Sequence, residues 1–525
     1  MERALLLTAF YRSGAADGES VPVARAMAFR YLLEHKKLYV GRGELIVGER
    51  GPAPKATPTF PEICTHTLGD FDILDSREKI PFRVDAEARR AQAEEIIPYW
   101  SKRSIRERIF ESMEDDWIAA YESGLFTEFQ EQRAPGHTVL DDKIYRLGFK
   151  DLIKKIRKSA QQLDKKSDAG ASARRDELRA MEIAAEALIA YAGRYAEFLR
   201  ELAGSEEGEF RRELEETAVV CDRVPARPPR TFREALQYYW FVHLGVITEL
   251  NTWDSFNPGR LDRHLWPFYR DGLADGSLTK QGARELLEAF WVKFNNQPAP
   301  PKVGVTAQES NTYTDFCLIN LGGVDEEGED AVNELTFLIL DVIEEMRLLQ
   351  PGSMIQVSRK NPDRYLHRAL RIVRTGFGQP SVFNTEAIVG ELLRQGKSLV
   401  DARNGGASGC VETGAFGKES YILTGYLNLP KILEIALHDG IDPRRKTRVG
   451  PSTGTPASFA SFDDLYTAFE RQLRHVVDVK IRGNRVIERL WAAYLPAPFM
   501  SLLIDDCIER GRDYNDGGPR YNTSY

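Results

Sequence analysis

Cysteine is scarce in this sequence, with five thiols in 525 residues. They are Cys64, Cys221, Cys317, Cys410 and Cys507, an odd number of widely scattered residues without a CxxC pair. This usage argues against a disulfide framework and against a zinc site, and it is typical of a reducing compartment. We therefore expect a cytoplasmic protein with no metal site.

Long hydrophobic runs and a strong excess of one charge are also missing. No apolar run approaches the roughly 20 residues that a membrane-spanning helix needs. The short apolar stretch at residues 4–10 has no convincing signal-peptide cleavage site, and we interpret it as the start of a helix. The net charge is −8 with acidic and basic residues interspersed, which argues against nucleic acid or a membrane as a partner.

Apolar residues at helical spacing dominate the chain. Thr279 and Ser461 are predicted N-caps, and Asp464 completes a capping box with Ser461. A third helix is predicted over residues 328–346. The polar stretch 165–176 is interpreted as an exposed connection between helices.

Short apolar runs of strand length lie between the later helices, at residues 316–321, 354–357 and 381–383. Such runs alternating with helices predict βα units around a largely parallel sheet. The first 250 residues contain few such runs and are predicted to be mainly helical. The sequence therefore indicates an α/β fold with a helical N-terminal part.

The densest chemical signal is NGGASGCVETG, residues 404–414. Glycine permits tight backbone and positive φ, so this stretch is expected to be a loop with Cys410 near its tip. In an extended segment, residues i and i+2 point to one side, which would direct Cys410 and Glu412 into one cavity. A carboxylate raises the pKa of a neighbouring thiol and disfavours a thiolate nucleophile. The pair suits a sulfur that carries hydrogen atoms beside a carboxylate that moves protons; the alternative is a buried structural cysteine.

The same stretch carries a resemblance to a known family. GCVE in a glycine-rich loop resembles the active-site cysteine loop of the pyruvate formate-lyase-like glycyl radical enzymes. The longer SGCVETGAFGKESYILTGYLNLPKILE, residues 408–434, is similar to the hydroxyproline dehydratase branch of that family. Further stretches agree with this branch along nearly the whole chain: GELIVGERG, TFPEICTHT, LFTEFQEQRAPGHT, TELNTWDSFNPGRLD and WVKFNNQPAPPKVG.

The resemblance implies a ten-stranded α/β barrel surrounded by helices. The whole chain would be one pyruvate formate-lyase-like domain, with a largely helical part at about 1–250 and a barrel part with the cysteine loop at about 251–525. In this family a glycine near the C-terminus, in a motif resembling RVxGY, holds a radical. A separate activating enzyme with S-adenosylmethionine and an iron–sulfur cluster installs it, and the complete form is expected to be a homodimer. No cofactor is implied in the chain itself.

The sequence departs from the family pattern at its C-terminal side. No RVxGY-like element is present, and the nearest similar stretch, residues 448–451, has proline after the glycine. The glycyl radical domain is therefore expected to be absent and the barrel incomplete at residue 525. We expect this chain alone to be inactive, as a fragment or as one of two chains.

The resemblance also implies site residues. Cys410 matches the position of the thiyl radical and Glu412 the adjacent acid/base, with His137 and Asp254 as further catalytic residues. The substrate-binding matches are Phe129, Ser310, Asp315, Phe316 and Tyr426. Each of these has a simpler alternative, such as a core aromatic, a helix cap or a turn residue.

The activity implied is the radical dehydration of trans-4-hydroxy-L-proline to pyrroline-5-carboxylate, with a small-molecule substrate and an activating enzyme as partners. Cys410 would abstract hydrogen from the ring carbon next to nitrogen, and hydroxide would leave with a proton. The alternatives are another glycyl radical eliminase, acting on choline, glycerol, propane-1,2-diol or a sulfonate such as isethionate, and a non-catalytic, truncated relative that only binds a ligand or its activating enzyme.

Overall fold

Helices form the first part of the protein. The computed structural model describes residues 1–127, 137–163, 170–250, 256–298 and 317–524. The helices up to residue 250 are α1 (Glu2–Arg12), α2 (Val21–His35), α3 (Leu68–Ser76), α4 (Ala86–Ala91), the π-helix η1 (Gln92–Ile96), α5 (Ile97–Trp100), α6 (Ile105–Ser112), α7 (Asp115–Glu122), α8 (Lys143–Arg146), α9 (Phe149–Leu163), α10 (Ala171–Ala203), α11 (Gly208–Arg223) and α12 (Phe232–Glu249). Helix α1 confirms the helix predicted from residues 4–10.

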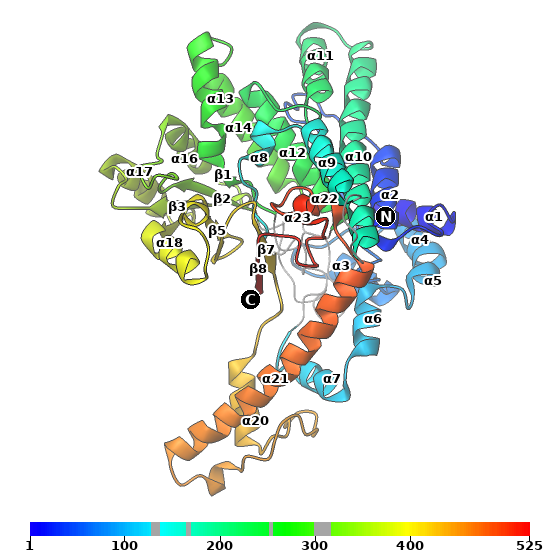
Figure 1. The fold of residues 1–525 in the computed structure, drawn as a ribbon, viewed down its shortest axis with the longest axis vertical. Helices are drawn as coiled ribbons and strands as arrows, with labels where there is room; N and C mark the ends of the chain where they lie inside the picture. The colour runs from blue at the N-terminus through cyan, green and yellow to red at the C-terminus, as the bar shows by residue number, and fades with distance from the viewer. Residues whose placement is uncertain (128–136, 164–169, 251–255, 299–316, 525) are drawn as a thin grey trace.

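Helix α12 forms the centre of this helical part. Its residues from Ala235 onward are all buried, as expected for a helix that is apolar on every side. The alanine-rich α10 packs beside α2, α9 and α11 (Figure 1). Because α10 begins at Ala171, the expected connection over residues 165–176 is wrong for its second half. The two alanines and two arginines in residues 171–176 favour helix over loop.

Strands and helices alternate in the second part. The elements after residue 250 are β1 (Gly259–Arg260), α13 (Leu261–Asp275), α14 (Lys280–Asn295), β2 (Leu318–Gly322), α16 (Glu334–Met346), β3 (Gly352–Val357), α17 (Asp363–Val373), β4 (Ser381–Asn384), α18 (Thr385–Arg394), α19 (Leu399–Asn404), β5 (Gly406–Ser408), β6 (Glu412–Gly414), β7 (Glu419–Ile422), α20 (Leu429–Leu437), the 3₁₀-helix η2 (Pro456–Ser458), α21 (Phe462–Tyr494), α22 (Pro498–Ser501), α23 (Cys507–Arg510) and β8 (Tyr521–Ser524).

Strands β1 to β4 form one parallel sheet in sequence order. Asn320 of β2 is opposite Met354 of β3, and Met354 is opposite Ser381 of β4. Strand β2 is buried along its whole length, whereas most of β4 is exposed. Helices surround this sheet (Figure 1). The predicted strands and the α/β class of the glycyl radical enzyme fold are confirmed.

The structure confirms the first residues of the helices that were predicted from a capping residue. Thr279 accepts a hydrogen bond from the Gly282 amide, and Ser461 forms the expected capping box with Asp464. The helix predicted from residue 328 begins instead at Glu334, because Asn333 forms a capping box with Thr336.

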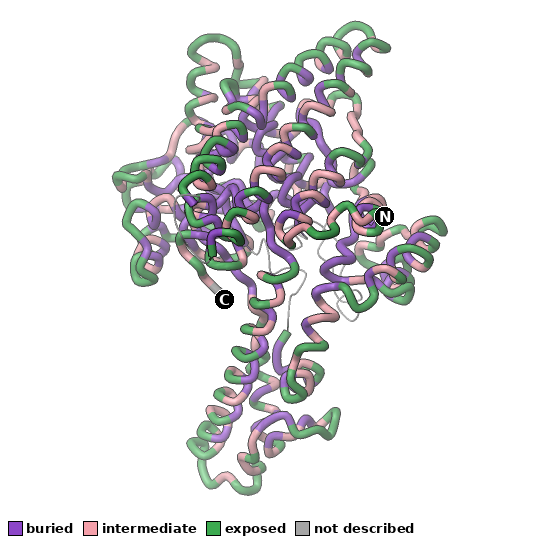
Figure 2. The backbone as a smooth tube through the Cα atoms, turned by 45° about the vertical axis from the view of Figure 1, so that its right-hand side comes forward, coloured by how far each residue is buried: buried purple, intermediate pink, exposed green. Residues whose placement is uncertain are grey.

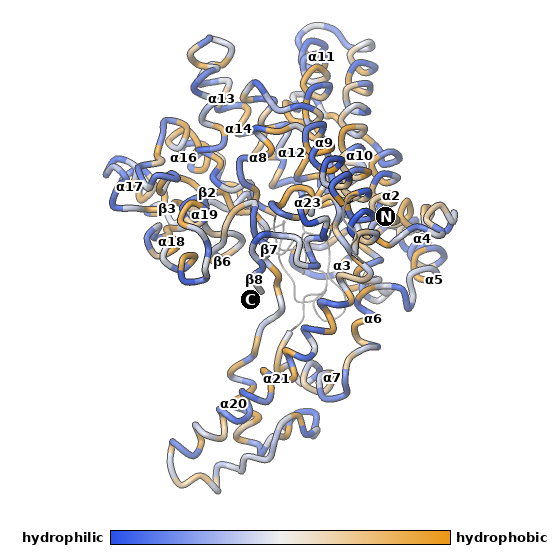
Figure 3. The backbone as a smooth tube through the Cα atoms, viewed as in Figure 1, coloured by the Kyte–Doolittle hydropathy of each residue, from blue (hydrophilic) through white to orange (hydrophobic). Residues whose placement is uncertain are grey.

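A projecting arm, defined here as residues 429–494, contains α20, η2 and α21 (Figure 1). Its small core joins α7 to α20 and α21 and includes Trp117, Ile432 and Val476. The outer end of the arm is largely exposed (Figure 2), and hydrophobic and hydrophilic residues alternate along α21 (Figure 3). None of the helices in the described ranges is long and apolar enough to cross a membrane.

Candidate functional site

Cys410 lies at the tip of a short hairpin. Strands β5 and β6 pair antiparallel, with Ser408 opposite Glu412, and the chain turns at residues 409–411. Cys410 is exposed. The expectation of an extended segment is therefore wrong at the tip, because Gly409 adopts a φ of +51° and reverses the chain.

Glu412 nevertheless meets the cysteine, by folding back onto the loop. Its Oε2 atom accepts hydrogen bonds from the backbone amides of Cys410 (3.1 Å) and Val411 (3.0 Å). The carboxylate is thus held against the backbone of the loop that carries Cys410.

His137 is the third residue of the cluster. Its Nδ1 lies 2.7 Å from Oε2 of Glu412, and the exposed fractions of the two side chains are 1% and 17%. The imidazole packs on Gly409, where an added Cβ would lie 2.6 Å from its Cε1 atom. Glycine is therefore required at 409 for its backbone angle and for the approach of the ring.

The segment that carries His137 is held beside the sheet. Val139 forms a parallel bridge with Asn257, and the Asn257 amide donates to the Thr138 carbonyl at 3.0 Å. Thr138 Oγ1 in turn lies 2.5 Å from the Tyr514 hydroxyl. These contacts fix the position of the imidazole relative to the hairpin.

The electrostatics keep Glu412 ionised. Burial raises the pKa of its carboxyl, but the hydrogen bond and charge interaction with His137 and the loop amides outweigh burial and lower it to about 2. The carboxylate faces Nδ1 of His137 at 2.7 Å and favours a hydrogen on that nitrogen. The cluster therefore consists of a cysteine, an anion and an imidazole.

The base of the hairpin rests on buried polar residues. Glu419 accepts from the Ala415 amide at 2.7 Å and forms an ion pair with Lys397 at 2.7 Å, with exposed fractions of 0% and 2%. On the other side, Asn320 and Gln356 bind the backbone at residues 405–407. Asn320 and Gln356 were not predicted from the sequence, although an amide side chain within an apolar, strand-length run is a signal that the sequence contains.

The structure places the other predicted site residues as follows. Tyr426 is 56% exposed and lies on the segment leading to α20, where its carbonyl accepts from the Thr127 amide at 3.0 Å. The structure thus brings together Cys410, Glu412 and His137 and places Tyr426 on a separate segment. The predicted residues that lie outside the described ranges are Phe129, Asp254, Ser310, Asp315 and Phe316.

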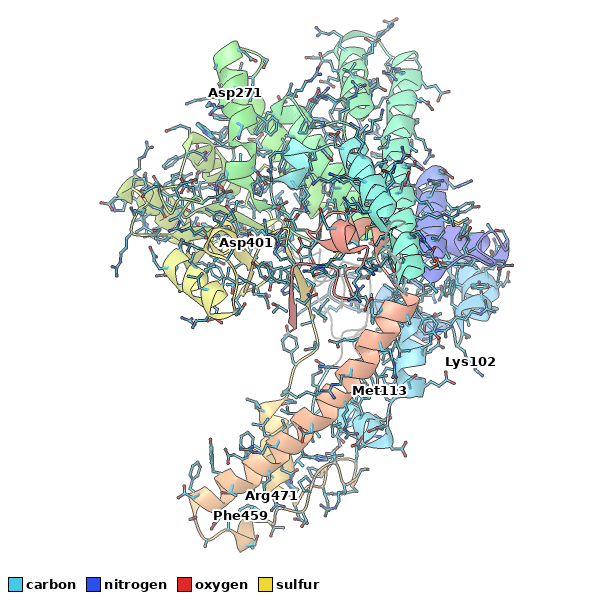
Figure 4. The ribbon with its side chains drawn as sticks, viewed as in Figure 1. Lys102, Met113, Asp271, Asp401, Phe459 and Arg471 are labelled. Carbon is cyan, nitrogen blue, oxygen red and sulfur yellow. The ribbon has the colours of Figure 1, made fainter. Side chains whose placement is uncertain are left out.

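A cavity of about 510 Å³ opens elsewhere, between α13, α19 and the loop after β6. Arg263, His264, Asp401 and Lys418 are among the residues that line it, whereas the cysteine cluster is not part of its lining. Figure 4 shows Asp401 beside the sheet, far from Phe459 in the arm. The charged side chains that line the cavity are largely paired with one another: Lys418, for example, lies 3.4 Å from Asp141. Within the described residues, no group of three metal-ligating side chains is assembled.

The chain is similar to a family model and to several dehydratases. A family model described as pyruvate formate lyase-like matches residues 1–525. The chain is 52% identical to a trans-4-hydroxy-L-proline dehydratase from Clostridioides difficile, over 100% of this chain and 66% of that protein. It is 30% identical to a (2S)-3-sulfopropanediol dehydratase from Klebsiella oxytoca, over 99% of this chain and 64% of the relative.

Solved structures agree with these relatives. The hydroxyproline dehydratase from Clostridioides difficile, solved with trans-4-hydroxy-L-proline bound, superposes with a TM-score of 0.97 at 52% identity, covering 100% of this chain and 66% of that one. A B12-independent glycerol dehydratase from Clostridium butyricum gives 0.92 at 28% identity, covering 100% and 66%. This chain therefore spans about two thirds of the length of these relatives. It belongs to the pyruvate formate lyase-like family of glycyl radical enzymes.

Proposed function

We propose that this chain supplies the cysteine side of the active site of a glycyl radical lyase that dehydrates trans-4-hydroxy-L-proline to pyrroline-5-carboxylate. The observation that carries the proposal is the contact of His137 and Glu412, 2.7 Å apart, at the base of the Cys410 loop. The 52% identity to a hydroxyproline dehydratase supports this substrate over those of the 30% identical relative.

In the proposed reaction Cys410 is the hydrogen-atom carrier. A glycyl radical, installed by a separate activating enzyme, would supply the unpaired electron. The Cys410 sulfur takes a hydrogen atom from the ring carbon next to nitrogen and later returns one to the product. The radical left on the ring weakens the neighbouring C–O bond, and the leaving hydroxide takes a proton and departs as water.

The His137–Glu412 pair handles that proton. Glu412 is proposed as the acid/base of the pair, and its low pKa of about 2 favours its acting as a proton acceptor near neutral pH. His137, whose Nδ1 lies 2.7 Å from this carboxylate, is proposed as the proton donor. Asp254 is proposed as a further catalytic residue, and the substrate-binding residues are proposed to be Phe129, Ser310, Asp315, Phe316 and Tyr426.

We propose the following organisation for the complete protein. Residues 1–250 would form its helical part and 251–525 the barrel part that carries the cysteine loop. The complete enzyme is proposed to be a cytoplasmic homodimer that needs no cofactor in this chain.

The test is a substrate comparison with the complete, activated enzyme. Trans-4-hydroxy-L-proline, choline, glycerol, propane-1,2-diol and isethionate are offered side by side, and kcat/KM is measured for each. We expect hydroxyproline to give the highest value, because its carboxylate, ammonium and ring each need a partner and an unmatched buried polar group costs about 1–3 kcal/mol. A higher value for another substrate overturns the substrate assignment, and no turnover despite a full radical signal favours a ligand-binding relative.

A further inference from the structure

Two buried amide side chains lie on one face of the sheet, next to the cysteine hairpin. They are Asn320 on β2 and Gln356 on β3, with exposed fractions of 0% and 1%. The register pairs Asn320 with Met354, so Gln356 lies two residues further along the same face of β3. A buried amide is costly unless its polar atoms are bonded, so the partners of these two define what they do.

Those partners are the backbone groups just before Cys410. Asn320 Nδ2 donates to the Ala407 carbonyl at 2.8 Å, and its Oδ1 accepts from the Ala407 amide at 3.1 Å. Gln356 Nε2 donates to the Gly405 carbonyl at 3.0 Å and lies 3.3 Å from Asn320 Oδ1. The two side chains thus bind β5 as a neighbouring strand would, although β5 is not part of the β1–β4 sheet.

The fit around these amides is close. An added Cβ at Gly406 would lie 2.5 Å from Gln356 Nε2 and 2.6 Å from Phe416. Residue 406 must therefore be glycine for the amides to reach the backbone on either side of it. Strand β5 is three residues long, and β6, which carries Glu412, pairs with it. A shift of β5 is therefore transmitted to both Cys410 and Glu412.

We propose that Asn320 and Gln356 are positioning residues that hold the Cys410 hairpin at a fixed place on the sheet. This inference rests on the proposed function of Cys410. Within the described residues, the two amides bond the backbone before the thiol and each other, so their effect is on the geometry of hydrogen transfer.

The first measurement is hydrogen exchange of residues 405–414 by mass spectrometry. Asn320→Leu removes both bonds to Ala407, and Gln356→Met removes the link to Gly405 and leaves the Asn320–Ala407 pair. We expect exchange of this segment to accelerate about tenfold or more in Asn320→Leu and by less in Gln356→Met, because local opening sets exchange rates. Unchanged exchange in both variants overturns the proposal.

Gln237→Leu is the matched control. Gln237 of α12 is also a buried amide that binds one residue through both backbone groups, accepting from the Val47 amide at 2.8 Å and donating to its carbonyl at 2.9 Å. Its loss should affect overall stability in the same way but leave exchange at 405–414 unchanged. Equal acceleration in this control would mean that the effect is general destabilisation, and the proposal fails.

The second measurement is turnover by the complete, activated enzyme. We expect kcat of Asn320→Leu to fall about tenfold or more with KM within about threefold and the glycyl radical signal unchanged, since small misplacements of reacting groups are costly. Gln237→Leu should retain kcat. Faster exchange without loss of kcat overturns the positioning role.

If Asn320→Leu does not fold, Gln356→Met is used for both measurements. If the unaltered enzyme prefers another substrate, the proposed function fails on that point, and the two measurements, made with that substrate, still decide the positioning role.

Discussion

In the proposed reaction, the thiol of Cys410 and the His137–Glu412 pair have different roles, and single substitutions separate them. The loop that carries Cys410 is glycine-rich and pinned by Glu412, so replacing one side-chain atom leaves its backbone contacts in place. Residue-scale experiments can therefore test the chemistry apart from the fold.

Replacing the sulfur tests whether Cys410 carries the hydrogen atom. In the complete, activated enzyme, we expect Cys410→Ser to abolish turnover and to leave the glycyl radical signal, because a hydroxyl O–H bond is too strong to pass the hydrogen on. The measurement is electron paramagnetic resonance together with product formation. Cys221→Ala, which alters a buried thiol of α11, is the control and should keep its activity. Substantial turnover by the serine variant would rule out a thiyl role.

The pKa of Glu412 predicts a pH-dependent contribution to stability. Its folded-state pKa of about 2 lies below the ordinary value of about 4.3. The stabilisation from the ionised carboxylate is therefore complete above pH about 5 and is lost as the pH falls towards 2. We expect the difference in Tm between this chain and its Glu412→Gln variant to shrink between pH 6 and 3. A constant difference across that range would contradict the ionised His137–Glu412 contact.

At the scale of the element, the β5–β6 hairpin depends on a turn that only glycine fits. Gly409 has a positive φ, which favours glycine, and the His137 ring lies where a Cβ would be. The backbone angle and the packing therefore both require glycine at this position.

We therefore expect Gly409→Ala to destabilise the protein more than Gly276→Ala. Gly276 ends α13 with a φ of +78° and has nothing within 4 Å of an added Cβ, so its replacement costs only backbone strain, about 1–2 kcal/mol. Gly409→Ala adds a clash with His137 to that strain. Urea unfolding midpoints give the comparison, and the alanine at 409 should also lower turnover of the complete enzyme. Equal midpoints would show that the ring does not press on the turn.

For the molecule as a whole, the buried His243 and the half-buried His264 predict sensitivity to acid. Burial, with a smaller effect from neighbouring arginines, lowers the pKa of His243 and of His264 to about 3. Both are therefore neutral in the folded protein at pH 6, whereas the unfolded chain binds protons near the ordinary pKa of about 6.5. Folding stability should fall as the pH decreases from about 6.5 to 3.

The variant that tests this is His264→Asn, which cannot take up the proton. Its Tm should fall less steeply between pH 6.5 and 4 than that of the unaltered chain. His367→Asn, at an exposed position of α17, is the control and should keep the original slope. Parallel slopes for all three proteins would contradict the assignment of His264 as a neutral group in the folded protein.

Much of the local structure, and the proximity of Cys410 and Glu412, could be predicted from the sequence. Helix caps at Thr279 and Ser461, and strand-length runs at β2, β3 and β4, depend on residues a few positions apart, so the sequence pattern predicts them. The predicted boundaries were wrong where the cap at Asn333 was not recognised and where α10 begins after Gly170, which offers no capping side chain. Cys410 and Glu412 were recognisable for the same reason, since they lie two residues apart.

The surroundings of that pair depend on how the elements pack. The 2.7 Å contact of His137 with Glu412 joins residues far apart in the chain, and it exists because residues 137–140 lie against Asn257 beside the sheet. Asn320 and Gln356 reach the hairpin for a similar reason, because the register of β2 and β3 places them under β5. Sequence periodicity assigns a residue to a face of its own element, but the packing of elements determines which residues that face meets.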